Sequence, residues 1–306
     1  MLETLTDPAT KVQFAGHDTF PLRLLWLKKA YDAVRDGADK GLFQRPDAIA
    51  RFGVGRNMVF AIKHWAVAAQ MIEEVGDKFF PTPLGRLLLD DADGLDPYLE
   101  DPATAWITHY IFAGAPEQTT TFCYAFNFIT QSDFDRAAIV KSLLELADAR
   151  KAARATAETI KRDVEVFVRS YISRGASEDA AEPLLAELGL LREGRAAGHL
   201  EFVRGPKPTL NDGVFAWALR RYWRRWHTDM PTLSMEQICY GAGSPGRVFK
   251  LDEDSVHARL ARIGAITDEA LVWTDTAGLR QVSFRQEPDD EALLRKAYQA
   301  RIRLAA

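Results

Sequence analysis

The stretch PDAIARFGVGRNMVFAIKHWAVAAQMIEEVGDKFFPTPLGRLLL, residues 46–89, has the residue pattern of a helix, a turn, a second helix, a hairpin and a third helix. Gly53 and Gly55 bracket a single residue, which is enough to end a helix and turn the chain sharply. Apolar residues then recur at helical spacing over residues 56–71, and Gly76-Asp77 centres a tight hairpin. This order of elements predicts a winged helix-turn-helix module.

The polar face of the second helix in this stretch carries residue types that bind DNA. Arginine can fork onto guanine edges or a phosphate, asparagine can pair with adenine, and lysine supplies a point charge for the backbone. The predicted DNA contacts are Arg56, Asn57, Lys63 and His64 on this face and Arg86 in the third helix. Small winged modules also serve as protein docking domains, and the sequence leaves this alternative open.

The composition limits the kind of protein. The 306 residues are 47% hydrophobic, enough to bury large cores, and two or three domains are expected. The formal net charge is −4, so a surface that binds nucleic acid must be a local patch. Cys123 and Cys239 lie far apart, which argues against a zinc site or disulfide framework and favours the reducing cytoplasm. No membrane partner is expected, because the chain has neither a long apolar run nor a signal-peptide pattern.

The motif FAGHDTFPLR, residues 14–23, leads into the predicted first helix of the winged module. His17 and Asp18 stand side by side before a helix N-terminus, where they could bind a phosphate or a metal ion. The alternative is a helix cap combined with a structural hydrogen bond.

The middle of the chain is predicted to be helical. Residues 90–101 are acidic, but their spacing does not fit a calcium-binding EF-hand loop, so a solvated, helix-capping linker is expected. Residues 103–129 are rich in aromatic side chains and should form core helices, and residues 134–171 continue with helical composition. A short helix and a hairpin that returns over residues 200–203 repeat the order of helix and wing.

Residues 204–227 hold the densest positive charge of the chain. The apolar residues of this segment form one helical stripe, so the arginines are expected to project outward. Arginine interleaved with Trp and Tyr suits a phosphate track with stacking, and Arg220, Arg221 and Arg224 are predicted DNA contacts. A solvated helix face, or salt bridges to the acidic linker, would explain the same pattern.

The C-terminal region begins with a glycine-rich loop, GAGSPGRVF, at residues 241–249. Its backbone amides and Arg247 could bind a phosphate, although glycine-rich turns also join helices without a ligand. Strands over residues 271–274 and 279–284 make a further predicted wing. The fold class is mainly α with small β-hairpins (α+β). The expected domains are an N-terminal winged helix-turn-helix module (1–90), a central helical region with a small hairpin (91–230) and a C-terminal winged-helix-like module (231–306).

Five motifs resemble one family: FAGHDTFPLR (14–23), GVGRNM (53–58), LDPYLEDP (95–102), LLAELGLL (184–191) and SPGRVFKLDE (244–253). It is a domain-of-unknown-function family of bacterial DNA phosphorothioation loci that includes SspB-like DNA nicking components, and the resemblance covers nearly the whole chain. It implies a place in a phage-defence system in which a PAPS-reductase-like enzyme and a cysteine desulfurase supply sulfur. The sulfur replaces a non-bridging phosphate oxygen, and the resemblance implies that this protein nicks the DNA that receives it.

Two functions are compatible with these observations. The first is a DNA nickase, whose chemistry needs an activated water and charge stabilisation, usually from carboxylate-held Mg²⁺ or Mn²⁺ with Lys or Arg. The sequence carries no recognisable nuclease signature, so His17, Asp18 and Arg23 are the remaining candidate catalytic group. The second is a non-catalytic winged-helix DNA-binding adaptor or transcriptional regulator. No organic cofactor is indicated, and a monomer and a homodimer both stay open.

Overall fold

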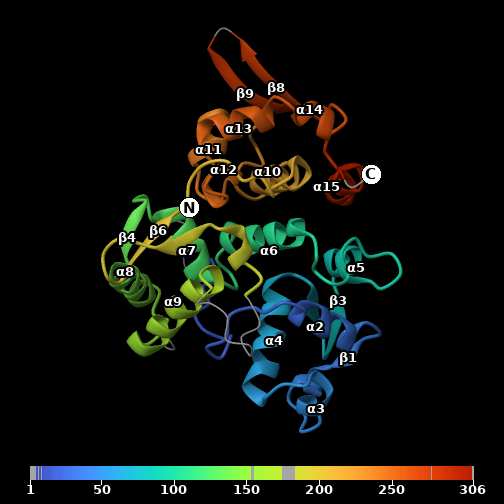
Figure 1. Ribbon diagram of the computed structural model, residues 1–306, viewed down its shortest axis with the longest axis vertical. Coiled ribbons are helices and arrows are strands. Elements are labelled where there is room, and N and C mark those ends of the chain that lie inside the picture. Colours follow the sequence, from blue (N-terminus) through green and yellow to red (C-terminus); the bar gives the residue numbers. More distant parts are fainter. Residues whose placement is uncertain are drawn as a thin grey trace.

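The computed structural model describes residues 5, 7, 9–152, 155–173, 183–276 and 278–304 (Figure 1). These residues form an α+β protein whose body is helical and whose strands make small antiparallel sheets of three strands each. The N-terminal elements are α2 (Trp26–Val34), β1 (Ala38–Asp39), the 3-10 helix η1 (Lys40–Phe43), α3 (Ala48–Phe52), α4 (Arg56–Ala68), β2 (Ile72–Val75), β3 (Lys78–Pro81) and α5 (Pro83–Leu89).

The central and C-terminal elements continue the same mixture of helices and short strands. The central ones are α6 (Pro102–Gly114), α7 (Thr120–Phe128), β4 (Asp133–Asp135), α8 (Arg136–Ala149), α9 (Ala157–Tyr171), the 3-10 helix η2 (Ala186–Leu188), β5 (Leu191–Glu193) and β6 (His199–Phe202). The C-terminal ones are α10 (Asp212–Trp226), β7 (Thr232–Ser234), α11 (Met235–Tyr240), α12 (Pro245–Val248), α13 (Glu253–Leu260), α14 (Ile263–Ile266), β8 (Leu271–Thr276), β9 (Leu279–Phe284) and α15 (Asp290–Leu304).

The N-terminal stretch follows the predicted order of helix, turn, helix, hairpin and helix. Gly53 closes α3 in the left-handed conformation (φ 64°), and its N–H donates to the carbonyl of Ile49. Glycine adopts this conformation without the steric cost of a Cβ. α4 ends earlier than expected because the chain turns at Gln70 (φ 58°), where the N–H of Met71 donates back to Ala66 O. β2 and β3 form the predicted hairpin.

The three sheets share one topology. In each, the first strand in the chain lies at an edge, and the last strand lies between it and its own hairpin partner: β1-β3-β2, β4-β6-β5 and β7-β9-β8. The helices α2, α7 and α10 come directly before the three first strands, and further helices separate each first strand from its hairpin. The repeated order of helices and hairpin that the sequence predicts is present along the chain, and each repeat also has a first edge strand that the sequence does not predict.

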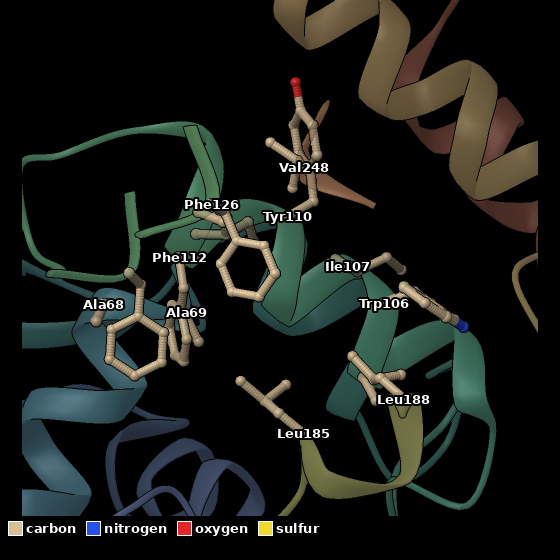
Figure 2. Packing of buried hydrophobic residues seen from close by; sticks show 14 of the residues in the cluster. Ala68, Ala69, Trp106, Ile107, Tyr110, Phe112, Phe126, Leu185, Leu188 and Val248 are labelled. Atoms are coloured by element: carbon tan, nitrogen blue, oxygen red, sulfur yellow. The ribbon is translucent and has the colours of Figure 1, made fainter. Parts of the chain in front are cut away.

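α6 lies at the centre of the core, with every side chain from Ala103 to Gly114 buried. Figure 2 shows that its residues meet all three parts of the chain: Phe112 lies beside Ala68 and Ala69, and Tyr110 lies beside Val248. An aromatic side chain buries about 150–250 Å². The aromatic content of residues 103–129 therefore joins the N-terminal and C-terminal parts around one hydrophobic core, as the sequence predicts for core helices.

The segment SPGRVFKLDE is fixed to the end of α7 by two basic side chains, the buried Lys250 and the half-buried Arg247. Lys250 is fully buried, and its ammonium donates to Phe126 O at 2.7 Å and lies 3.9 Å from the centre of the Phe202 ring. Burial lowers the pKa of this lysine well below its ordinary value. The guanidinium of Arg247 donates twice to Asn127 O, at 3.1 and 2.8 Å. These donors satisfy carbonyls at a helix C-terminus that would otherwise be unpaired.

The acidic segment 90–101 is more tightly bound than the expected solvated linker. Asp96 is buried, and its carboxylate accepts the backbone N–H groups of Glu100 and Asp101 at 2.8 and 3.1 Å. Lys28 pairs with Asp91 at 2.6 Å. The expectation of a solvated segment is therefore wrong for Asp96. None of the helices in the described ranges is both long enough and apolar enough to cross a membrane.

Candidate nucleic-acid interface

α10 carries the predicted arginine cluster at its C-terminal end. Asn211 caps the other end by accepting the N–H of Val214 at 2.9 Å. Asp212 lies in the first turn and Arg224 and Arg225 in the last, the arrangement that the helix dipole favours. The apolar side of α10 is buried against α6, α12, α14 and α15. The arginines are therefore left at the surface side of this helix.

Three of the four arginines near the end of α10 form ion pairs. The pairs are Arg220 with Asp290 (2.6 Å) and Glu287 (2.9 Å), Arg224 with Glu287, and Arg225 with Glu117. Salt bridges were one of the open explanations for this charge, but the acids come from α6–α7 and from the start of α15 rather than from segment 90–101. The cluster is thus balanced by carboxylates that lie far away in the sequence.

Arg221 differs from its neighbours. In the part of the chain that the structure describes, no carboxylate lies within ion-pair distance of its guanidinium. One Nη donates to the side-chain oxygen of Gln70 at 2.9 Å, and the guanidinium lies 4.9 Å from the centre of the Trp217 ring. Burial lowers the pKa of Arg221, because the charged form has lost part of its water. Arg221 is therefore a partly desolvated cation without an acidic partner.

A cavity of about 400 Å³ opens beside these side chains. Its lining includes Arg220, Arg221, Arg224, Arg225, Tyr110 and Glu117, and we call it the arginine cavity. Burial raises the pKa of the Tyr110 hydroxyl, so this group is a neutral hydrogen-bonding partner at ordinary pH. The arrangement concentrates guanidinium donors, which bind phosphate oxygens in pairs, on one wall.

A larger cavity of about 700 Å³ adjoins it, between the N-terminal elements α4, β2 and α5 and the helices α10 and α15. Most of its wall is apolar, including Val67, Leu84, Leu87, Trp217 and Leu294, and we call it the apolar cavity. Gln70, Arg221 and Asp290 line both cavities. The two spaces therefore meet at the unpaired arginine.

One solvent-facing stripe of α4 leads toward these cavities. Arg56, Phe60 and Lys63 follow each other at helical spacing, and Val67 on the next turn lines the apolar cavity. Arg56 and Asn57 are exposed and Lys63 is half-buried. Arg56 makes a long hydrogen bond, 3.5 Å, to Gln44 O, and its guanidinium lies 5.7 Å from the centre of the Phe60 ring. We call Arg56, Asn57, Phe60 and Lys63 the α4 stripe.

His64 lies on the same side of α4 as Asn57 but is covered by residues 13–17, so its predicted exposure on the polar face is wrong. It is buried, 7% exposed, and its Nδ1 lies 3.4 Å from the amide nitrogen of Gln13. Burial lowers its pKa to about 3, which keeps the imidazole neutral. His64 immediately precedes the fully buried Trp65, and the two rings pack edge to face at 5.0 Å. Helical spacing gives the direction of this side chain but does not show that Gln13 and His17 pack over it.

The three candidate catalytic residues line neither the arginine cavity nor the apolar cavity. His17 is 3% exposed, and its Nε2 lies 2.6 Å from the carboxylate of Asp163 in α9, which also accepts the N–H of Ala15 at 2.7 Å. Asp18 is exposed with φ 45°. Arg23 lies 5.5 Å from the Trp26 ring centre. The structural hydrogen bond considered for His17 is thus present, and a catalytic role stays a prediction.

The remaining predicted contacts are spread over two other helices. Arg86 is exposed on α5. Arg247, on α12, is half-buried, and burial lowers its pKa. Since its guanidinium donates to Asn127 O, it is already engaged in holding the fold. Of the predicted DNA contacts, the structure brings only Arg220, Arg221 and Arg224 together around one cavity.

Several residues of this surface carry no sequence signal. Gln70, Glu117, Glu287 and Asp290 come from separate segments and reach the arginines only through the tertiary fold. Within the described ranges, no three His, Cys, Asp or Glu side chains are placed to share a metal ion. The side chains of the described residues therefore do not form a metal cage of three such ligands.

Comparisons with known proteins identify the family. A family model described as "Protein of unknown function (DUF4007)" matches residues 14–298. A structure described as "SspB crystal structure" is similar with a TM-score of 0.84 and 28% identity, over 96% of this chain and 90% of that one. A "Magnesium ion-bound SspB crystal structure" gives 0.85 and 27% over the same shares. No curated protein sequence matches. The chain belongs to the DUF4007 family.

Proposed function

We propose that this protein binds DNA as a component of a bacterial DNA phosphorothioation system and nicks the DNA on which that system acts. The similarity to SspB over nearly the whole chain supports the place in that system. The observation that carries DNA binding is the α4 stripe. It presents Arg56, Asn57 and Lys63 on one exposed helix face that leads to the arginines of α10.

The N-terminal elements support a winged helix-turn-helix with α4 as its recognition helix. α3 and α4 are joined by a turn at Gly53–Gly55, and the hairpin β2–β3 pairs with β1 in the order β1-β3-β2. A major groove about 12 Å wide admits one α-helix. From Arg56 to Val67 the helix rises roughly 16 Å, at 1.5 Å per residue. That length corresponds to roughly five nucleotide steps of about 3.4 Å along one strand.

The α10 arginines would extend this contact along the DNA backbone. Glu117, Glu287 and Asp290 hold Arg220, Arg224 and Arg225 in the absence of DNA. A carboxylate and a phosphate oxygen are both bidentate acceptors for arginine, so a phosphate can take the place of a carboxylate on the same fork. These ion pairs are exposed or half-exposed, and each stabilises the protein by only about 0–1 kcal/mol. Replacing a carboxylate by a phosphate therefore loses little free energy.

Nicking is the finer part of the proposal. Hydrolysis of a phosphodiester needs a water to attack phosphorus and a positive environment for the charge that develops. Guanidinium groups of the arginine cavity are suited to the second requirement. Magnesium is usually held by one or two carboxylates together with phosphates of the substrate, which is compatible with the magnesium-bound SspB structure. The proposed partners are the PAPS-reductase-like enzyme and the cysteine desulfurase of the system.

A salt titration of DNA affinity tests the binding surface. Each phosphate contact contributes about 0.9 to the slope of log affinity against log salt. We expect Arg56→Ala and Lys63→Ala to weaken binding, and Arg162→Ala to leave it unchanged. Arg162 is the matched control because it is exposed on α9 and pairs with Glu158 of its own helix. Equal affinity in all four proteins would show that α4 does not touch DNA.

Supercoiled plasmid, incubated with the protein in Mg²⁺, Mn²⁺ or EDTA, tests nicking. Open circles formed in the metal-containing reactions support the proposal. DNA binding without open circles would support the second function, a non-catalytic adaptor. That alternative is favoured by one specific observation, which is that His17 is already occupied by Asp163. His17→Ala with normal nicking per folded molecule would remove His17 from the catalytic group.

A further inference from the structure

The junction of the two cavities combines an anion site with an apolar chamber. Arg221 lies at that junction, and Gln70 and Asp290 border both spaces with it. Arg220 adds a buried Nε for which the described residues provide no acceptor. A buried donor without an acceptor costs free energy, so an entering anion oxygen would find unsatisfied hydrogen-bonding capacity here.

The apolar cavity has the features of a site for a flat, hydrogen-bonding ring. Its walls include Val67, Leu84, Leu87 and Leu294, and Trp217 forms one end beside Arg221. Its polar lining includes the carboxylates of Glu73, Glu74 and Glu291, of which Glu74 pairs with Lys40 and Glu291 pairs with Arg295. The exocyclic amino groups of adenine, guanine and cytosine are donors. A base would therefore pack on the apolar walls and donate to the carboxylates.

The charged side chains that line the two cavities limit the kind of ligand that can occupy both. The apolar cavity offers mostly apolar walls with carboxylates and Lys11 at its border, whereas the arginine cavity gathers four guanidinium groups around Glu117 and Asp290. A ligand that fills both needs an anionic group at one end and a neutral ring with N–H donors at the other, which describes a nucleotide. Volumes of about 700 and 400 Å³ lie within the range of ligand pockets, roughly 300–1,000 Å³.

We propose that the paired cavities bind one nucleotide, with its phosphate on Arg221 in the arginine cavity and its base in the apolar cavity. The source of the nucleotide rests on the proposed function: it is an unpaired nucleotide turned out of DNA bound along α4. Enzymes that act on a single nucleotide commonly turn it out of the stack and pack the base between aromatic and apolar side chains. A free nucleotide has the same chemistry and is distinguished by experiment.

The test compares two duplexes that differ in one base. One carries a single unpaired adenosine, and the other carries an abasic residue at the same position, so that their phosphates are identical. Affinities are measured by fluorescence anisotropy, with deoxyadenosine monophosphate and inorganic phosphate as competitors. A stacked base is worth roughly 5- to 150-fold in affinity, so wild-type protein should prefer the adenosine duplex by at least roughly fivefold.

Two kinds of variant test which cavity binds the base and which binds the phosphate. Leu84→Trp fills the apolar cavity from α5 and should remove the preference for the adenosine duplex while leaving the affinity for a fully paired duplex unchanged. Val67→Trp fills it from α4 and serves if Leu84→Trp does not fold, as judged by the melting temperature. Arg221→Gln should weaken binding of both bulged duplexes. Arg162→Gln is the matched control and should behave as wild type.

The outcomes separate this inference from the proposed function. Equal affinity for the two bulged duplexes overturns the nucleotide site, even if DNA binding itself is strong. A preference that survives both Trp variants overturns its assignment to the apolar cavity. If the protein binds no DNA but titration calorimetry shows that it binds deoxyadenosine monophosphate and not inorganic phosphate, the cavity holds a free nucleotide and the proposed function is refuted.

Discussion

Buried histidines should make this protein sensitive to mild acid, and His109 is the clearest case. It lies in α6 with no exposed surface. Its Nε2 donates to Val248 O at 3.0 Å, and its Nδ1 accepts from the hydroxyl of Tyr171 at 2.7 Å. This pattern requires the neutral ring. Burial lowers the pKa of His109 to about 3.

The sign and size of the effect follow from the two pKa values. A histidine in the unfolded chain takes up its proton near pH 6.5, whereas folded His109 resists protonation down to about pH 3. Stability is therefore full above pH 6.5 and falls as the pH decreases toward the folded value. At pH 5, about 1.5 units below the pKa of a histidine in the unfolded chain, the loss of unfolding free energy is about 2 kcal/mol. His64, with a pKa of about 3 for the same reason, contributes a similar amount.

Urea unfolding at pH 8 and pH 5 measures this effect. Wild-type protein should lose about 4 kcal/mol of unfolding free energy between the two pH values, a large part of a typical total of about 5–15 kcal/mol. His109→Gln should lose only about 2 kcal/mol, because one titrating group is gone. His257→Gln, at an exposed site on α13, should lose as much as wild type. An equal loss in His109→Gln and wild type would refute the reasoning.

Three further predictions concern single substitutions. Lys63→Ala should reduce the salt slope of DNA affinity by about 0.9 with an unchanged melting temperature, and an unchanged slope would exclude a phosphate contact. Asp163→Ala removes the acceptor for His17 Nε2 and for the N–H of Ala15, so the unfolding free energy, measured in urea, should fall by about 1–3 kcal/mol; wild-type stability would contradict these buried hydrogen bonds. Gly246→Ala places a Cβ 2.6 Å from Cys239 Cα, so we expect about 1–3 kcal/mol of destabilisation and a lower melting temperature, and wild-type stability would contradict this contact.

The sequence predicted those parts of the fold that depend on local signals. The glycines at positions 53 and 55 marked the turn between α3 and α4, and Gly76-Asp77 marked the β2–β3 hairpin. Gln70 gives no such signal, because a glutamine in the left-handed conformation has no sequence signature. The sequence therefore predicts a helix up to residue 71, whereas α4 ends at Ala68. Local chemistry therefore identified the elements better than their boundaries.

The candidate site was predictable only in part. The α10 arginines were found from charge density and from an apolar stripe, which are properties of one helix. Their partners, Glu117, Glu287 and Asp290, depend on how α6, α7 and α15 pack around α10. The apolar cavity arises between elements that are far apart in the sequence, and no local pattern encodes it. The predicted exposure of His64 is wrong for the same reason. Its burial depends on neighbours from outside α4, which the pattern of the helix does not reveal.

The central claim is that the exposed face of α4 touches DNA, and site-specific photo-crosslinking tests it most directly. A benzophenone amino acid is placed at Phe60 in the α4 stripe and, as a control, at Tyr240, an aromatic residue of α11 that is 48% exposed. The account predicts that the Phe60 probe crosslinks to duplex DNA at low salt and that the Tyr240 probe does not. DNA binding with no crosslink from Phe60, or with a crosslink from Tyr240 alone, would contradict it.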